Sequence, residues 1–253
     1  KTSIELADEY FQSGIFEYCE PNFIYPEGSN LCFTPNDTRF GGQWNLLNIG
    51  QTVKTSSLRL GDVNSYNGLT GSDMSITKAW DLTLGDPSVE IAVFDTGIDS
   101  THPDFAGNVL TGYDANIDTY GVPLDSSFFA HGTNCAGIIG AVTNNNLGVS
   151  GIAGGCKLRS YKIFTSTRYT NSIIQARAFD TARVNGISII SCSWNAEENS
   201  TLTNAINNCA LNGRGGLGCI ILFASGNDGI SSPSYPSYLA NVVSVGSSTP
   251  SDQ

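Results

Sequence analysis

An acidic residue and a histidine occupy two positions of this chain at which side chains commonly do chemistry. Asp95 follows the apolar run Val89–Phe94, which is typical of a buried strand. His131 begins a run of small residues that favours a helix packed closely on its neighbours. A carboxylate that accepts from one imidazole nitrogen fixes the tautomer and leaves the other nitrogen to act as a general base. Together the two residues predict hydrolytic chemistry.

A third candidate, Asn227, lies in the sequence Ser225-Gly226-Asn227 after the apolar run 219–224. A side-chain amide held on a glycine turn at the end of a strand can donate to a developing oxyanion. We therefore expect Asn227 to lie close to Asp95 and His131.

The elements that must position these residues alternate between strands and helices from Ile76 onward. Strands are predicted at 89–94, 157–164, 187–192, 219–224 and 241–246, and helices from 131, at 172–184 and at 201–211. This alternation predicts an α/β fold, a parallel sheet with helices on both faces. Functional groups of such sheets gather at the carboxyl ends of the strands.

Composition excludes several classes of partner. Only 14% of the 253 residues are charged and the formal net charge is −11, so the chain offers no basic face for nucleic acid or for an anionic membrane. The apolar runs are shorter than the ~20 residues of a membrane span.

Low charge, abundant Ser, Thr and Asn, and two sequons indicate an exported protein. Seven cysteines are scattered along the chain without a CxxC pair, and with two histidines they do not favour a zinc site. Asn36 and Asn199 begin N-x-S/T sequons. We expect secretion, with the signal peptide upstream of Lys1.

The motifs Asp95-Thr96-Gly97-Ile98-Asp99, His131-Gly132-Thr133 and Ser225-Gly226-Asn227, in that order, closely resemble those of the subtilisin-like serine proteases, the subtilases or peptidase S8 family. The resemblance implies that Asp95 orients the base, that His131 is the base and that Asn227 donates to the oxyanion. It also implies a polypeptide substrate and no catalytic cofactor.

Substrate-binding residues follow from the same resemblance. Ser193, Trp194 and Asn195 fall where the family pairs an extended substrate and walls its primary specificity pocket, although a glycine is usual at the position of Asn195. Trp194 has two interpretations, as pocket wall and as core.

A structural calcium site is also implied by the resemblance. Its ligands would be Gln43, Asp104, Asn145 and the carbonyl groups of Leu147 and Val149. The alternative is that Asn144-Asn145-Asn146 forms an ordinary turn without a metal.

The start of the chain resembles the end of the inhibitory propeptide of such enzymes, most clearly from Tyr10 to Pro26. We therefore expect residues 1–26 to be a short α/β propeptide remnant, 27–75 a linker with loops, and 76–253 a partial catalytic domain. The propeptide would be a partner of the enzyme. Alternatively, the first segment is a helix and strand of the same domain.

The family's nucleophile lies in a Gly-Thr-Ser-Met-Ala type turn, and no such sequence occurs in this chain. We expect a fragment truncated before the nucleophile helix, inactive by itself, whose partner is the missing C-terminal part of the domain. The competing hypothesis is a pseudoprotease that binds peptides without cutting them.

Three other residues have alternatives. The triplet Asp95-Thr96-Gly97 also occurs in aspartic proteases, but those are β-rich and need two such carboxylates. His102 is interpreted as part of a turn before Pro103, the alternative being a catalytic histidine. Cys135, one helical turn after His131, is either a small buried hydrophobe or a thiol beneath the imidazole.

Overall fold

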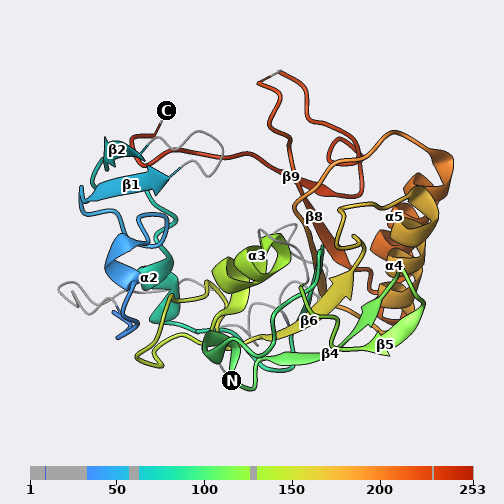
Figure 1. Cartoon of the computed structure of the whole chain (residues 1–253), viewed down its shortest axis with the longest axis horizontal. Coiled ribbons are helices and arrows are strands. Elements are labelled where there is room, and N and C mark those ends of the chain that lie inside the picture. The colour runs from blue at the N-terminus through green and yellow to red at the C-terminus, as the bar shows by residue number, and fades with distance from the viewer. Residues whose placement is uncertain (1–8, 10–32, 57–62, 126–129, 230, 253) are drawn as a thin grey trace. The chain divides into compact units, whose positions relative to one another are not determined.

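The computed structural model describes Glu9 and residues 33–56, 63–125, 130–229 and 231–252. The chain divides into two units, Lys1–Cys32 and Phe33–Gln253. The predicted propeptide remnant, apart from Glu9, lies outside the described residues. The sheet and the helices that cover it belong to the second unit (Figure 1).

A seven-stranded sheet in the order β5-β4-β6-β3-β7-β8-β9 forms the centre of this unit (Figure 1). Its strands are β3 (Glu90–Asp95), β4 (Val109–Asp114), β5 (Thr119–Gly121), β6 (Lys157–Lys162), β7 (Ile189–Cys192), β8 (Ile220–Ala224) and β9 (Val243–Val245). Every neighbouring pair is parallel except β4 and β5, which form an antiparallel pair at one edge. The predicted α/β fold with a parallel sheet is confirmed.

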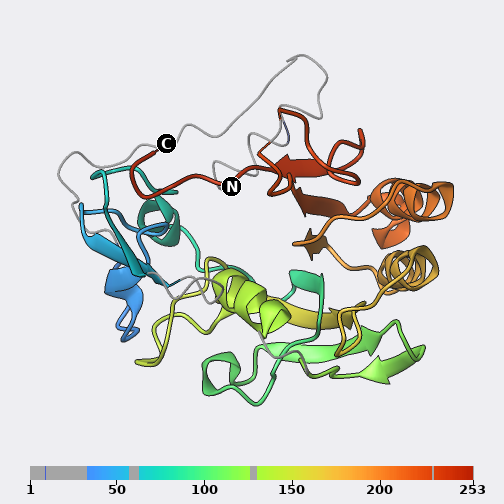
Figure 2. The same ribbon diagram turned by 45° about the horizontal axis from the view of Figure 1, so that its top comes forward.

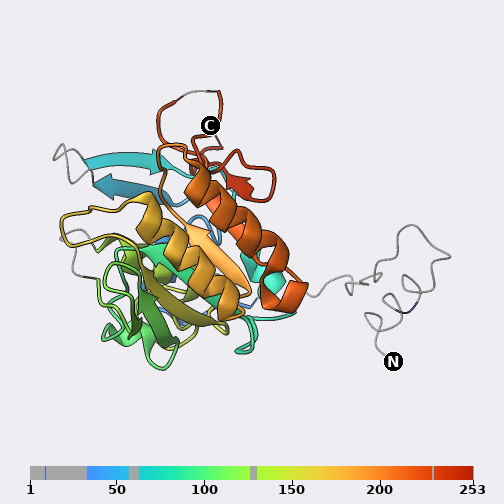
Figure 3. The ribbon, with the colours of Figure 1, turned by 90° about the vertical axis from the view of Figure 1, so that its right-hand side faces the viewer.

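Helices cover both faces of the sheet, as Figure 2 shows. They are α3 (His131–Gly140), α4 (Ser172–Val184) and α5 (Ser200–Asn212), whereas α2 (Ile76–Trp80) packs in a separate cluster with Phe40 and Leu46. The α3 helix packs on β3 and β6, whereas α4 and α5 lie side by side across the opposite face (Figure 3).

The position of β3 explains why its sequence is apolar from Ile91 to Phe94. Ile91 and Val93 belong to the core cluster beneath α3, whereas Ala92 and Phe94 belong to the cluster beneath α4 and α5. A strand covered on both faces buries every side chain, so its pattern is continuous and not alternating.

The α3 face of β8 and β9 carries apolar side chains that the described residues do not cover. Ile220, Val243 and Val245 are 53%, 50% and 46% exposed, and Leu222 between them is half-buried. Leu222 pairs in register with Val243, and Ala224 with Val245, so these side chains share one face. We call Ile220, Leu222, Val243 and Val245 the uncovered strip.

The region 27–75 differs from the expected linker and loops. It contains an antiparallel hairpin of β1 (Thr52–Ser56) and β2 (Val63–Asn67), and a short 3-10 helix at Phe40–Gly42. These strands are polar and, among the described residues, pair with each other alone, so no period-2 apolar pattern marks them in the sequence.

Two further 3-10 helices span Pro103–Phe105 and Arg214–Gly216. Within the described segments, none of the helices combines the length and apolar character needed to span a bilayer.

Candidate active site

Asp95 lies at the carboxyl end of β3, in the middle of the sheet. Its side chain is 2% exposed, and its Oδ1 accepts a hydrogen bond of 2.8 Å from the backbone N–H of Thr96. This bond fixes the carboxylate at the sheet edge, where neighbouring parallel strands also end.

Helix α3 begins at His131 and packs against the end of β3 through two glycines. A β-carbon on Gly132 would lie 2.2 Å from the carbonyl oxygen of Gly97 and 3.0 Å from Cβ of Asp95. The N–H of Gly132 also donates to Oγ1 of Thr96 at 3.0 Å. Only a residue without a side chain permits this approach, which brings the first turn of α3 onto Asp95.

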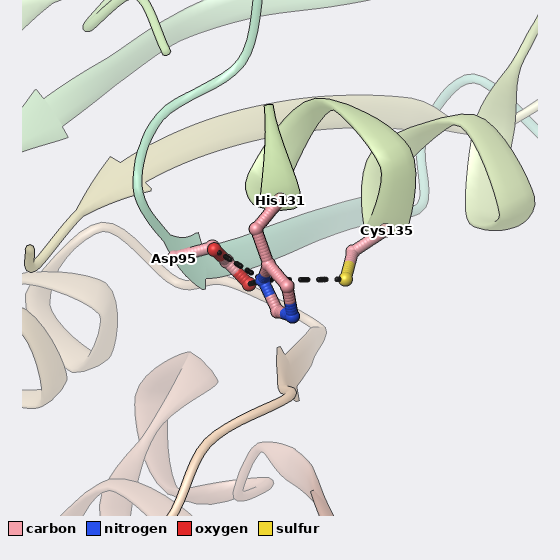
Figure 4. A group of neighbouring side chains, drawn as sticks. All are labelled: Asp95, His131 and Cys135. Atoms are coloured by element: carbon pink, nitrogen blue, oxygen red, sulfur yellow. Dashed lines mark hydrogen bonds and ion pairs between the residues drawn. The ribbon is translucent and has the colours of Figure 1, made fainter. Parts of the chain in front are cut away.

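The imidazole of His131 meets the carboxylate of Asp95 edge-on (Figure 4). Its Nδ1 lies 2.8 Å from Oδ1 and 2.9 Å from Oδ2 of Asp95. The hydrogen bond to Asp95 is the largest cause that raises the pKa of His131 from 6.5 to about 10, and Cys135 adds to it. The paired carboxylate therefore stabilises the imidazolium, the species formed when a base accepts a proton.

Cys135 lies one turn further along α3, with its Sγ 3.9 Å from Nδ1 of His131 (Figure 4). The residue is half-buried. Potential ligand atoms of Asp95, His131 and Cys135 all lie within 4.8 Å of one another. Of the two interpretations of Cys135, the structure supports the thiol beside the imidazole.

The residues after β7, the strand next to β3, occupy different environments. Trp194 is buried, its Nε1 donates to the carbonyl of Phe94 at 2.9 Å, and its ring contacts Phe223 edge-on with 4.9 Å between centroids. Its side chain therefore belongs to the core beneath α4 and α5. Ser193 is half-buried and Asn195 is exposed.

Asn227 lies in the exposed turn that follows β8, the next strand beyond β7. The turn begins at Gly226, whose φ is +113°, and is closed by a hydrogen bond from the N–H of Ser234 to the carbonyl of Ser225 at 2.8 Å. A cavity of about 210 Å³ lies against this turn. Asp95 and Asn227 thus follow strands that end at the same edge of the sheet, with β7 between them.

His102 lies outside this group, as expected. It precedes the 3-10 helix Pro103–Phe105, and its Nδ1 accepts from the N–H of Asp104 at 3.2 Å. The imidazole is exposed and caps this turn.

Most of the residues proposed for calcium meet around the loop 144–150. Oδ1 of Asp104 accepts from Nδ2 of Asn145 at 3.0 Å, and its Oδ2 accepts from the N–H of Val149 at 2.8 Å. The N–H of Leu147 donates to Oδ1 of Asn145 at 2.8 Å. Gln43 instead makes two hydrogen bonds to the backbone of Ser150, one from Nε2 and one to Oε1.

Asp37 also accepts hydrogen bonds from the same loop, and the sequence did not predict it as a ligand candidate. Its Oδ2 accepts from the N–H of Asn144 at 2.7 Å and from Oγ of Ser150 at 2.9 Å. Its Oδ1 is buried and has no hydrogen-bond partner within the described part of the chain. The only local signal is a carboxylate in the sequence Pro35-Asn36-Asp37-Thr38. A buried anionic oxygen without a partner fits a cation site.

Comparison with known proteins agrees with this geometry. The model of the subtilase family, peptidase S8, matches residues 86–253. A thermophilic serine proteinase of Bacillus sp. (strain AK1) is 33% identical over 92% of this chain and 49% of its own length. Thermitase of Thermoactinomyces vulgaris is 35% identical over 69% of this chain and 60% of its own length. The chain thus spans about half to two thirds of the length of these relatives.

More distant relatives and solved structures agree. Human neuroendocrine convertase 2 is 31% identical over 81% of this chain and 32% of its own length. The Aeromonas sobria serine protease, in a complex with a chaperone, superimposes with a TM-score of 0.64 at 22% identity, over 78% of this chain and 33% of that one. A prenylagaramide maturation protease superimposes with a TM-score of 0.53 at 28% identity, over 68% of this chain and 57% of that one. With the motifs of Asp95 and His131 inside the matched region, the chain belongs to the subtilase family of serine proteases.

Proposed function

We propose that this chain supplies the orienting acid, the base and the oxyanion donor of a subtilisin-like serine endopeptidase. The observation that carries the proposal is the hydrogen bond between Nδ1 of His131 and Oδ1 of Asp95, which lie 2.8 Å apart at the edge of the sheet. Asp95 holds Nδ1–H of the imidazole, so Nε2 takes the proton of a serine hydroxyl as that oxygen attacks the peptide carbonyl. The same Nε2 then gives the proton to the leaving amine.

Asn227 is proposed to donate its side-chain amide to the oxyanion of the tetrahedral intermediate. Its position after β8 supports this role, because β3, β7 and β8 are consecutive in the sheet and end at one edge. Ser193 and Asn195, between them on the loop after β7, are proposed to contact an extended polypeptide substrate. Trp194 is proposed to support that loop from the core.

The nucleophilic serine is proposed to lie in a segment of the parent protein beyond Gln253. Among the described residues, the hydrogen bonds of His131 involve Asp95 and Cys135 and no serine hydroxyl. The uncovered strip supports this proposal, since a helix that carries the nucleophile and packs on β8 and β9 would bury it. The 253-residue chain is then inactive by itself.

Residues 1–26 are proposed to be the remnant of a propeptide that inhibits the parent enzyme. The match to the thermophilic serine proteinase supports this proposal, because it covers 92% of the chain and so extends well before residue 86. We also propose that the parent enzyme is secreted, in keeping with the sequons at Asn36 and Asn199.

A structural calcium ion is proposed at the loop 144–150. Asp37 and Asp104 would supply carboxylate oxygens, and Asn145 with the carbonyl groups of Leu147 and Val149 would complete the set. Asp37 replaces Gln43, whose amide is already paired with Ser150. When bound, the ion would cross-link the loop to the two carboxylates and neutralise their charge.

The experiment that tests the function uses a fluorophosphonate probe, which labels activated serines. The protein expressed from the uninterrupted parent reading frame is expected to react at one serine and to hydrolyse peptides, and His131→Ala is expected to abolish both activities. The 253-residue chain is expected to do neither. Labelling of a serine in that chain would contradict the missing nucleophile, and a parent protein that binds peptides without reacting would be a pseudoprotease.

A further inference from the structure

Two buried thiols face each other where α5 ends and β8 begins. Cys209 lies in the last turn of α5 and is 0% exposed, whereas Cys219 directly precedes β8 and is 6% exposed. Both are reduced in this structure. The catalytic mechanism proposed above uses neither of them.

The loop between the two cysteines doubles back on itself through glycines. Gly215, Gly216 and Gly218 have φ of +68°, +101° and +77°, which is the left-handed region. The carbonyl of Gly213 accepts hydrogen bonds from the N–H groups of Gly216 and Gly218 at 3.0 and 2.9 Å. These bonds return the chain to the end of α5, so Cys219 lies beneath the helix turn that contains Cys209.

Gly213 leaves the space that the sulfur of Cys219 occupies. A β-carbon at Gly213 would lie 2.2 Å from Sγ of Cys219 and 2.7 Å from the carbonyl oxygen of Cys209. The same carbonyl accepts the N–H of Gly213 at 3.1 Å. The sulfur is therefore held against the backbone of Cys209, and the interaction between the two thiols is the largest cause of the pKa shift of each.

We propose that Cys209 and Cys219 form an intrachain disulfide that ties the end of α5 to the start of β8. The oxidant is another disulfide, such as glutathione disulfide or the oxidised CxxC pair of a thiol oxidoreductase. One cysteine attacks a sulfur of the oxidant and releases its first thiol. The second cysteine then attacks the mixed disulfide and releases the second thiol. Two sulfurs of the protein are oxidised, two of the oxidant are reduced, and the two thiol hydrogens end on the oxidant.

The surroundings of the pair determine the order of attack. The hydrogen bond from Cys209 lowers the pKa of Cys219, to which the positive charges of Arg214 and Arg183 contribute. The same hydrogen bond and burial raise the pKa of Cys209. Cys219 is therefore the attacking thiolate. Residues 214–217, in the loop that leads to Cys219, are exposed.

The consequence concerns the strand that leads to Asn227. A cross-link at the first residue before β8 anchors this strand to α5, and both elements belong to the core cluster that contains Cys209 and Cys219. Reduction of the oxidised protein is expected to lower its melting temperature by about 6–10 °C, since a loop of this length contributes a few kcal/mol.

A peptide map of the protein, purified in air without a reducing agent, tests the disulfide between Cys209 and Cys219. After alkylation of free thiols and denaturation, trypsin cleaves behind Arg183 and Arg214, which separates Cys209 from Cys219. The expected product is peptide 184–214 joined to the peptide that begins at Gly215. Its mass is expected to be two hydrogen atoms below the summed mass of the same two peptides with Cys209 and Cys219 as thiols. Treatment with dithiothreitol is expected to separate them.

Variants assign the bond, because peptide 184–214 also contains Cys192. Cys209→Ser and Cys219→Ser are each expected to abolish the joined product and the effect of dithiothreitol on melting, whereas Cys192→Ser and the matched buried control Cys156→Ser retain both. If Cys209 and Cys219 are both alkylated after incubation with glutathione disulfide and unfolding, or if Cys209→Ser retains the link, the proposal is wrong.

Discussion

Gly132 lies against Gly97 so closely that a β-carbon on Gly132 would come within 2.2 Å of the carbonyl oxygen of Gly97. This contact joins the start of α3 to the end of β3 without any side chain between them. The separation of Asp95 and His131 is thus set by two glycines that carry no chemistry themselves.

The first prediction follows from this contact. Gly132→Ala is expected to push α3 away from β3 and to destabilise the protein by about 1–3 kcal/mol, the usual cost of overpacking. Gly137→Ala in the same helix is the matched control, because its β-carbon would meet only the ring of Phe105 at 4.0 Å. That variant is expected to be neutral or more stable. Urea denaturation of both variants tests this, and equal losses would contradict the packing argument.

The second prediction concerns the pH dependence of the pair. In the folded chain the pKa of His131 is raised from 6.5 to about 10, chiefly by the hydrogen bond to Asp95. The stabilisation is therefore complete below about pH 6.5 and is lost as the pH rises through about 10. Asp95→Asn is expected to lower the pKa of His131 and to remove this stabilisation.

Two measurements check that prediction. NMR titration of the imidazole, assigned with His102→Gln, follows the pKa directly. The stability difference between the wild-type chain and Asp95→Asn is expected to be larger at pH 6 than above pH 10. A difference that grows with pH would have the wrong sign for a raised histidine pKa.

The third prediction concerns calcium. Addition of calcium is expected to raise the melting temperature of the wild-type protein, and chelation is expected to reverse the rise, because an ion that binds only the folded state stabilises it. Asp37→Asn and Asp104→Asn are expected to abolish the response. Asp180→Asn, an exposed carboxylate on α4, is the control that retains it. If Asp37→Asn responds like the wild type, Asp37 is not a ligand.

The fourth prediction addresses the proposed oxyanion donor, Asn227, and is tested in the proposed parent enzyme. Asn227→Ala is expected to lower kcat by about 10²–10³-fold with little change in KM, as for other oxyanion-hole donors. The neighbouring Asp228→Asn, also exposed, is expected to leave kcat nearly unchanged. A change in KM alone would assign Asn227 to substrate binding.

Much of the sheet was predictable because its inner strands are buried on both faces. The predicted helix 172–184 has the bounds of α4, and the predicted strands 157–164, 187–192 and 219–224 contain β6, β7 and β8. Continuous apolar runs and one-sided helices carry a strong local signal.

The outer strand β4 was not predicted, for a physical reason. It contains Gly112, which a strand pattern does not favour, and its register with β6 shifts between Leu110 and Tyr113. A β-carbon on Gly112 would lie 2.0 Å from the carbonyl oxygen of Ser160, so the glycine is required by the neighbouring strand. Such tertiary requirements leave no periodic trace in the sequence.

The candidate site was predictable where one residue follows a strand or begins a helix, as Asp95 and His131 do. Trp194 could not be assigned, since a strand end permits both burial and exposure and only the contacts with Phe94 and Phe223 decide. Asp37 was missed because its partners lie more than a hundred positions away, in the loop 144–150.

The central place of β3 in the sheet has a consequence for hydrogen exchange. With β6 on one side and β7 on the other, the amides of β3 can open only when much of the sheet opens, so they are expected to exchange by global unfolding. The exposed turn of Asn227 follows β8, next to the edge strand β9, and can open locally. Asp95 and Asn227 are therefore expected to differ in opening free energy, and mild destabilisation is expected to release the turn of Asn227 while Asp95 stays in place.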